Sequence, residues 1–217
     1  MASKFRKALE SGKFVVTCEI APPKGTNLKK MLHHVELLKD KVDAINITDH
    51  QSSVMRFPSL GGALLVKESG GEPILQMTCR DRNRLAIQAD LLFAWSRGIA
   101  NVLCLTGDYV TLGDHPQAKP VFELDSVSLL LAARRLEEGE DLAGNELTGK
   151  PDFYLGCAVT PGYEPWELQV LKMERKIKAG AQFFQTQAVY EPKKFEEFMK
   201  ATKHLNVPIP VSYTHLR

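Results

Sequence analysis

Hydrophobic and polar positions repeat along the chain in one order: a short apolar run, a polar or Gly/Pro-rich break, then an amphipathic stretch of helical length. Apolar runs such as FVVTCEI at 14–20 and VLCL at 102–105 show little polar alternation, which is typical of strands covered on both faces. The pattern predicts six strands, at Phe14–Ile20, Ala44–Thr48, Pro73–Thr78, Asn101–Thr106, Phe153–Ala158 and Phe183–Gln187. It also predicts six helices, at Leu28–Lys39, Ser59–Ser69, Asn83–Arg97, Ser126–Leu136, Pro165–Ala179 and Pro192–His204.

Strands that alternate with helices predict an α/β fold with a parallel sheet and right-handed crossovers. Six such units fit either a doubly wound sheet or most of a (β/α)8 barrel, and the pattern alone does not choose between them. The long polar connections 108–125 and 137–152 contain no second core. We therefore expect one domain, which is the default for 217 residues.

The bulk composition argues against several classes of protein. A content of 44% hydrophobic and 25% charged residues is ordinary for a globular domain. The net charge of +2, with both signs interspersed, predicts no surface for nucleic acid or for an anionic membrane. No apolar run is long enough to span a membrane, and the start MASKFRKALESGKF lacks the apolar centre of a signal peptide. We therefore expect a cytoplasmic protein.

The cysteines and histidines carry no metal-binding pattern. Each cysteine lies alone within or at the end of an apolar run, and no CxxC spacing occurs, so small buried side chains are expected at Cys18, Cys79, Cys104 and Cys157. The six histidines are scattered without metal-ligand spacing. The sequence therefore predicts neither a disulfide framework nor a metal site.

Hydrogen-bonding or acidic side chains stand where nearly every predicted strand ends. In both candidate folds, ligands bind at the carboxyl ends of parallel strands. The pattern therefore predicts a polar ligand with many donors and acceptors, bound by residues drawn from Glu19, Thr48, Asp49, Gln76, Thr78, Thr106, Gly107, Asp108, Thr160 and Gln187.

Glu19 and Lys176 each allow two interpretations, and the signal at Asp108 is weak on its own. Glu19 lies in an apolar strand before a Pro-Pro turn, which suits a general acid, but it also fits an ion pair with Arg80 or Lys24. Asp108 follows Gly107, a residue that lets the backbone approach a ligand, although TGD alone is a weak signal. Lys176 belongs to a basic helix cluster that either faces solvent or holds a phosphate. Neither GxGxxG nor GxxxxGK[ST] occurs, which counts against a Rossmann dinucleotide site and a P-loop.

Several segments together resemble one known family. CEIAPPKG at 18–25, QMTCRDRN at 76–83, LCLTGD at 103–108, GCAVTPGYEP at 156–165 and AGAQFFQTQ at 179–187 are similar, in order and spacing, to motifs of the methylenetetrahydrofolate reductases. The resemblance extends from about residue 13 to residue 210. It implies the eight-stranded barrel in place of the doubly wound sheet.

The resemblance also implies an activity, a cofactor and roles for individual residues. The family reduces 5,10-methylenetetrahydrofolate to 5-methyltetrahydrofolate with bound FAD. Glu19 matches the acid that protonates the folate and opens its five-membered ring to an iminium. Asp108 matches the carboxylate near flavin and pterin, and Gln187 matches a glutamine that hydrogen-bonds the pterin. The expected flavin contacts are Thr48, Gln76, Thr106, Gly107, Asp108, Thr160, Gln169 and Lys176.

The sequence departs from the family pattern at four of these flavin positions. Gln76 stands where many members have His, and Thr106 where they have Arg; Thr160 replaces Tyr, and Gln169 replaces Asp. The resemblance leaves the electron donor open between NADH, NADPH and a partner iron–sulfur protein of the ferredoxin type. A homo- or hetero-oligomer also stays open. The alternative function is a non-catalytic barrel subunit that binds a partner reductase.

The C-terminal sequence predicts an incomplete barrel. After six βα units, NVPIPV at 206–211 begins a seventh strand, but SYTHLR at 212–217 does not continue as a buried strand. We therefore expect a partial barrel domain over residues 1–211 and a non-native tail over 212–217.

Overall fold

The computed structural model describes residues 2–212, and in this part of the chain six strands form one parallel sheet. Their order in the sheet is their order in the sequence, β1-β2-β3-β4-β5-β6. The bounds are β1 Thr17–Ile20, β2 Ala44–Ile47, β3 Pro73–Thr78, β4 Asn101–Leu105, β5 Tyr154–Val159 and β6 Phe183–Thr186. Each observed strand overlaps its predicted strand, and the first begins three residues later than expected, at Thr17.

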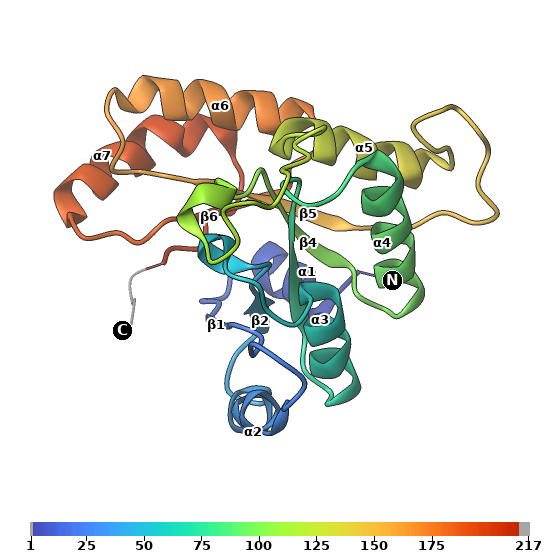
Figure 1. Cartoon of the computed structure of the whole chain (residues 1–217). Coiled ribbons are helices and arrows are strands. Elements are labelled where there is room, and N and C mark those ends of the chain that lie inside the picture. The colour runs from blue at the N-terminus through green and yellow to red at the C-terminus, as the bar shows by residue number, and fades with distance from the viewer. Residues whose placement is uncertain (1, 213–217) are drawn as a thin grey trace.

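A helix follows each strand, as the alternating pattern predicts. These helices are α2 Lys29–Leu38, α3 Ser59–Glu68, α4 Arg84–Ser96, α5 Ser126–Glu138, α6 Trp166–Lys178 and α7 Pro192–Thr202. Figure 1 shows them as an arc around one side of the curled sheet. A consecutive strand order with helices on the outer side is the arrangement of an incomplete (β/α)8 barrel, so the doubly wound alternative is wrong.

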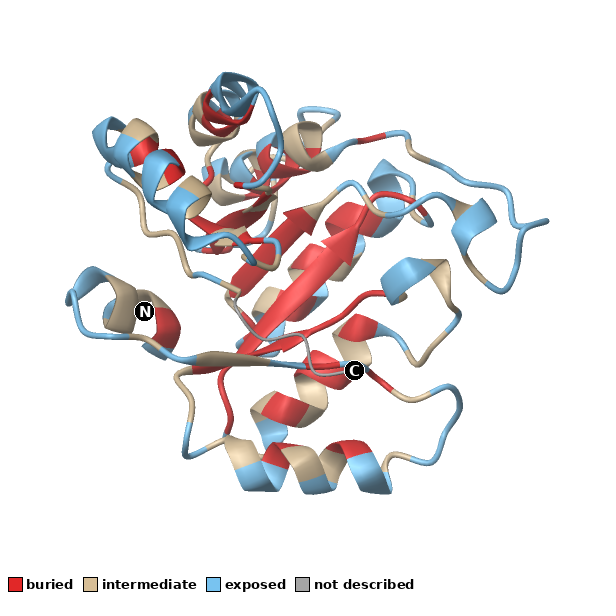
Figure 2. Ribbon diagram, turned by 90° about the vertical axis from the view of Figure 1, so that its left-hand side faces the viewer, coloured by how far each residue is buried: buried red, intermediate tan, exposed pale blue. Residues whose placement is uncertain are grey.

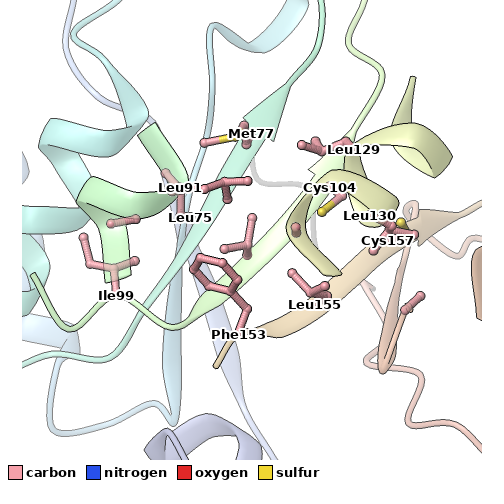
Figure 3. Close-up of a cluster of buried hydrophobic side chains, with 14 of the residues drawn as sticks. Leu75, Met77, Leu91, Ile99, Cys104, Leu129, Leu130, Phe153, Leu155 and Cys157 are labelled. Atoms are coloured by element: carbon pink, nitrogen blue, oxygen red, sulfur yellow. The ribbon is translucent and has the colours of Figure 1, made fainter. Parts of the chain in front are cut away.

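The outer face of the sheet packs against these helices to form the main core. Alternate strand residues such as Leu75, Met77 and Cys104 lie there, and Figure 3 shows them beside Leu91 of α4 and Leu129 of α5. Figure 2 shows the same division by burial: the strands are mostly buried, and the helices expose one side. Cys79, Cys104 and Cys157 are free thiols buried in this layer, as predicted, and Cys18 is half-buried.

The inner face of the sheet has a smaller core at the amino ends of the strands. Its buried residues are the intervening strand positions Ala44, Ile74, Leu103, Tyr154 and Phe183, together with Phe5. Phe5 makes edge contacts with Tyr154 and Phe183 at ring-centroid distances of 5.9 and 5.3 Å. The inner face of the strands therefore lines the interior of the partial barrel. Aromatic rings close that interior at the amino ends of the strands.

Phe5 comes from a helix that the sequence pattern did not predict, α1 Lys4–Glu10. Ser3 caps this helix by accepting a hydrogen bond from the backbone of Arg6, and its hydroxyl donates to Asn101 at 2.5 Å. The helix is seven residues long and buries one side chain, so its sequence has little hydrophobic periodicity to detect. In Figure 1 it lies inside the arc of the other helices.

Gly156 on β5 makes room for the inner aromatic core. A Cβ atom at this position would lie 2.2 Å from the ring of Phe183, its register partner on β6. Only glycine therefore fits beside Phe183 in this packing.

The residues of the predicted seventh strand lie beside β6 and accept backbone hydrogen bonds from it. The carbonyls of Pro208 and Pro210 accept bonds of 2.9 and 3.0 Å from the backbone N–H groups of Phe184 and Thr186 on β6. A parallel ladder would return a bond to the carbonyl of Phe184 from residue 210, but proline has no N–H. The segment beside β6 is therefore not a regular strand. Of the predicted tail, Ser212 is described and residues 213–217 lie outside the described part.

Candidate active site at the carboxyl ends of the strands

Because the strands run parallel, their carboxyl ends lie along one edge of the sheet, and the polar residues expected there lie at or just beyond those ends. Residues on the inner face are those that alternate with the outer core positions. By this criterion Glu19 on β1, Asn46 on β2 and Gln76 on β3 share the inner face of three adjacent strands. The first candidate group therefore faces the barrel interior.

Gln76 binds Glu19 directly. Its Nε2 donates a 3.1 Å hydrogen bond to Oε2 of Glu19, reaching past β2 to do so. Gln76 is buried, whereas Glu19 is exposed, because β1 is the edge strand of the described sheet. The sequence predicted apolar surroundings for Glu19, and this prediction is wrong, because the side chain is exposed to solvent. The ion pairs considered for it are wrong too, since Lys24 binds Asp114 and Arg80 binds Asp81.

Two buried oxygens near this group have no hydrogen-bond partner among the described residues. They are Oδ1 of Asn46 and Oγ1 of Thr48, and both residues are 1% exposed. An unsatisfied buried polar atom costs about 1–3 kcal/mol, so such atoms commonly mark a place where water or a ligand binds. Asn46 is also the register partner of Glu19. The inner mouth of the sheet therefore offers unused acceptors beside an acid.

Asp49, two residues beyond the end of β2, is the centre of a buried ion-pair network that sequence reasoning missed. Its carboxylate accepts hydrogen bonds from Ser59, from the backbone and hydroxyl of Thr78, and from Arg82 at 2.7 Å. Arg82 also pairs with Asp90 at 3.0 Å. The signal was present in the sequence, because Asp49 follows one buried strand and Arg82 follows the next. The network fixes the ends of β2 and β3 to each other.

The charges in this network perturb each other's pKa. Burial by itself raises the pKa of Asp49, but the charge and hydrogen bonds of Arg82 and the bonds from Thr78 outweigh it, so the pKa is lowered. Burial likewise opposes the charge of Arg82, but Asp49 and Asp90 raise its pKa above the usual value. Both groups are therefore held in their charged forms.

Asp108, after β4, is held by the loop that follows β2. Its Oδ2 accepts a 3.0 Å bond from the backbone N–H of Ser52, and its carbonyl accepts one of 3.1 Å from the Ser53 hydroxyl. His50, Ser52 and Ser53 all have positive φ, an uncommon backbone state for residues other than glycine. The β2–α3 loop is therefore strained where it holds Asp108, and strain of this kind is common at functional sites.

Gly107 occupies a narrow position between β4 and β3. Its φ is +99°, and a Cβ there would lie 3.1 Å from both Thr78 and Arg80. The glycine predicted from the sequence is thus required by the backbone conformation and by the close approach of β3. It lets Asp108 turn back over the strand ends.

Asp114 joins three loops at this edge. It pairs with Lys24 of the β1–α2 loop, accepts a 3.0 Å bond from the backbone of Met55, and lies 2.9 Å from the ring of His115. The hydrogen bond from Lys24 is the largest of the effects that lower the pKa of Asp114. Sequence reasoning missed this contact, because no local pattern pairs residues 90 positions apart.

Two of the remaining predicted residues, Thr106 and Lys176, have hydrogen-bond partners of their own. Thr106 is exposed, and its Oγ1 accepts a 3.1 Å bond from the backbone of Ser126 at the start of α5. Lys176 donates a 2.8 Å bond to the carbonyl of Ala158 at the end of β5.

Gln169 is buried on α6, and Gln187 is exposed after β6. No hydrogen bond or ion pair joins Glu19 to Asp108 or Gln187 within residues 2–212.

A hollow lies beside the end of β5. It has a volume of about 610 Å³ and is formed by residues 161–165 of the β5–α6 loop, by Trp166 and Glu167 at the start of α6, and by Lys194 and Glu197 of α7. Two of its aromatic side chains, Tyr163 and Trp166, are 66% and 39% exposed. Thr160 immediately precedes this loop, so the predicted β5 position borders a space with exposed aromatic rings.

Comparison with known proteins decides the family. The family model described as methylenetetrahydrofolate reductase matches residues 4–212. The chain belongs to the methylenetetrahydrofolate reductase family. A Caenorhabditis elegans relative described as a probable methylenetetrahydrofolate reductase (NADPH) is 25% identical over 206 residues. That match covers 89% of this chain and 29% of the relative, so this member of the reductase family spans less than a third of the relative's length.

Solved structures share the fold of this reductase family member. An uncharacterized Clostridium thermocellum protein, described as binding two copies of 5-methyl-5,6,7,8-tetrahydrofolic acid, aligns with a TM-score of 0.63 at 18% identity. The alignment covers 95% of this chain and 68% of that chain. A 2,3-dimethylmalate lyase aligns with a TM-score of 0.62 at 12% identity, over 98% of this chain and 79% of the lyase. At such identities the likeness shows the fold alone.

Two further features concern the whole described chain. No helix within residues 2–212 is both long and apolar enough to cross a membrane. In the same residues, His, Cys, Asp and Glu side chains form no group of three or more that could hold a metal ion.

Proposed function

We propose that this chain carries the chemistry of flavin-dependent reduction of 5,10-methylenetetrahydrofolate to 5-methyltetrahydrofolate. Membership of the reductase family supports the reaction class. The C. elegans relative carries the reductase name, and the folate described for the C. thermocellum protein is the product of the proposed reaction. These descriptions concern other proteins, so the assignment to this chain depends on its own residues.

The position of Glu19 gives the proposal its main structural support. It matches the family's acid, lies on the inner face at the carboxyl end of β1, and is bound by Gln76 at 3.1 Å. A carboxyl group here can deliver a proton to a ligand in the barrel mouth. Glu19 is therefore proposed to protonate the folate nitrogen and open the five-membered ring.

The residues at this edge fit a bound flavin. The Oγ1 of Thr48 is buried without a hydrogen-bond partner among the described residues, and a polar ligand at the strand ends would supply one. Gly107 has no side chain to obstruct a ring at the end of β4, where a Cβ would already crowd Thr78. FAD, once reduced by an electron donor, would supply the hydride, and these residues would hold the flavin and fix its orientation. Thr48 and Gly107 are thus proposed as flavin contacts.

Lys176 also retains the capacity to bind the cofactor. An ammonium group has three N–H donors, and the carbonyl of Ala158 accepts one of them. The other two are available for a phosphate oxygen. By contrast, the Oγ1 of Thr106 already accepts a bond from Ser126, which argues for a structural role at that position.

Asp108 and Gln187 are proposed to bind the folate. One carboxylate oxygen of Asp108 is engaged by Ser52, and the exposed carboxylate retains acceptor capacity on the other. A fixed negative charge there would stabilise the cationic iminium formed when the ring opens. The exposed amide of Gln187 has a donor and an acceptor for the pterin. The name of the C. elegans relative favours NADPH as the donor to be tested first.

The test compares wild-type protein with Glu19→Gln after addition of FAD. We expect both proteins to bind flavin, whereas Glu19→Gln should lose about 100- to 10,000-fold in the rate of folate reduction because the proton donor is gone. Glu36→Gln, an exposed change on α2, is the matched control and should behave as wild type. Equal rates in wild type and Glu19→Gln would contradict the proposal. Failure of the wild type to bind flavin would favour a non-catalytic barrel subunit.

A further inference from the structure

Gln76 hydrogen-bonds the proposed acid, a contact that its position in the family does not imply. The resemblance makes Gln76 a flavin contact, and in this structure its Nε2 donates to Glu19. Gln76 is 7% exposed, so its side chain is confined by the surrounding barrel. The hydrogen bond to Glu19 is therefore made by a glutamine at a position where many members of the family have histidine.

The other residues near Glu19 have different partners, so the hydrogen bond from Gln76 is the contact that orients its carboxylate. Glu19 takes part in no ion pair within residues 2–212, since the cations expected for it, Lys24 and Arg80, bind Asp114 and Asp81. Asn46, its register partner, directs its Nδ2 to the carbonyl of Cys18 at 3.4 Å. Gln76 is thus the residue whose donor is directed at the acid.

We infer that Gln76 is a positioning residue that orients Glu19 for proton transfer and stabilises the carboxylate that the transfer leaves behind. The inference rests on the proposed function. It assigns Gln76 to the acid and not to the flavin.

The chemistry of the step explains why a neutral amide donor is suited to this role. The carboxyl proton of Glu19 passes to the folate ring nitrogen, and the bond from that nitrogen to the methylene carbon breaks. The electron pair stays on the nitrogen, the methylene carbon becomes part of an iminium, and Glu19 becomes a carboxylate. A hydrogen bond to a carboxylate is about twice as strong as one to a neutral group, so Gln76 stabilises the charge as it develops. A glutamine has no titratable proton and does not compete with Glu19.

The first experiment tests whether the two side chains interact, and it needs neither flavin nor folate. Melting temperatures are measured for wild type, Gln76→Met, Glu19→Ala and the double variant. Methionine keeps the length of glutamine without its N–H donor. We expect non-additive shifts, because the second substitution removes a contact that the first has already broken. Additive shifts would overturn the inference.

The second experiment separates the acid from the flavin. The protein is loaded with FAD, the flavin is reduced chemically, and its re-oxidation by 5,10-methylenetetrahydrofolate is followed by absorbance. In Gln76→Met we expect unchanged flavin affinity and re-oxidation slowed by about 100-fold, the usual effect of removing one donor to a developing charge. Gln76→His keeps an N–H donor and should retain more of the rate.

Gln88→Met is the matched control for loss of a buried glutamine. Gln88 is 8% exposed on α4 and accepts a 2.7 Å bond from the backbone of Leu142, far from Glu19 in the fold. Its variant should melt at a lower temperature with unchanged flavin affinity and re-oxidation rate. Loss of flavin affinity in Gln76→Met, or a wild-type rate in that variant, would overturn the inference. Failure of the wild-type protein to bind flavin or react with the folate would instead refute the proposed function.

Discussion

The buried carboxylate of Asp49 links the ends of β2 and β3, where several of the proposed site residues lie. Its side chain is fully removed from solvent and receives hydrogen bonds from Ser59, Thr78 and Arg82. It follows Thr48, the residue with an unpartnered buried hydroxyl, and it anchors Thr78, against which Gly107 packs. Asp49 itself contacts no proposed ligand. Its expected contribution is therefore to the stability of the strand ends that do.

Replacing Asp49 with Asn should destabilise the protein by about 3–5 kcal/mol, because removal of one partner leaves the other charge buried and incompletely paired. Equilibrium urea unfolding measures this directly. Glu36→Gln, which breaks an exposed pair with Lys39, should cost less than about 1 kcal/mol. A loss for Asp49→Asn as small as that of the control would show that the network does not stabilise the fold.

The ion pair between Asp49 and Arg82 should also make the free energy of unfolding depend on pH in the acid range. The pKa of folded Asp49 lies below its value in the unfolded chain, because Arg82 and Thr78 outweigh the effect of burial. Its contribution is therefore complete above about pH 4 and is lost as pH falls through the lower folded pKa. Urea unfolding at a series of pH values should show the gap between wild type and Asp49→Asn narrowing with acid. A constant gap would contradict the assignment.

At the scale of elements, the sequence predicted the six strands and the helices that follow them, but not α1 or the contacts of the β2–α3 loop. The hydrophobic rhythm located six strands and six helices, because each buries a periodic apolar face. It missed α1, whose burial depends on one phenylalanine inserted among residues from distant strands. It also missed the contacts of Asp108 with Ser52 and of Asp114 with Met55, which arise only when the loops of neighbouring units meet.

Replacing Phe5 with Ala should destabilise the protein by about 3–5 kcal/mol, the usual cost of removing a fully buried phenylalanine. The ring contacts Tyr154 and Phe183 across the amino end of the barrel, so its loss leaves a cavity between two strands. Urea unfolding is again the measurement. Phe14→Ala is the control, since Phe14 is 89% exposed and should change stability by less than about 0.5 kcal/mol. Equal effects would mean that α1 does not close the barrel.

The strain in the β2–α3 loop should be relieved by glycine at Ser52. The φ of Ser52 is 56°, a conformation that costs a residue with a side chain about 1–2 kcal/mol and glycine almost nothing. After allowance for the greater freedom of glycine in the unfolded chain, Ser52→Gly should raise stability by about 0.5–1 kcal/mol. Ser52→Ala keeps the Cβ and should give no such gain. If the two variants melted alike, the loop would not be strained.

At the scale of the whole molecule, the sequence pattern and the family resemblance contributed different things. The pattern predicted alternating strands and helices but fitted two architectures, because both bury strands in the same way. The resemblance chose the barrel, and the consecutive strand order confirms it. The positions of Glu19, Asp108 and Gln187 at strand ends were also predictable. Their separation and their different partners were not, because these depend on how loops from several units fold over the strand ends.

We propose that a flavin binds at this edge of the sheet and exchanges hydride with a folate. The most direct test is to load the purified chain with FAD, remove excess cofactor, and add 5-methyltetrahydrofolate without oxygen while recording the flavin absorbance. We predict that the bound flavin bleaches in wild type and that Glu36→Gln behaves in the same way. Flavin that stays bound and fully oxidised in the presence of excess 5-methyltetrahydrofolate would refute the proposed reaction.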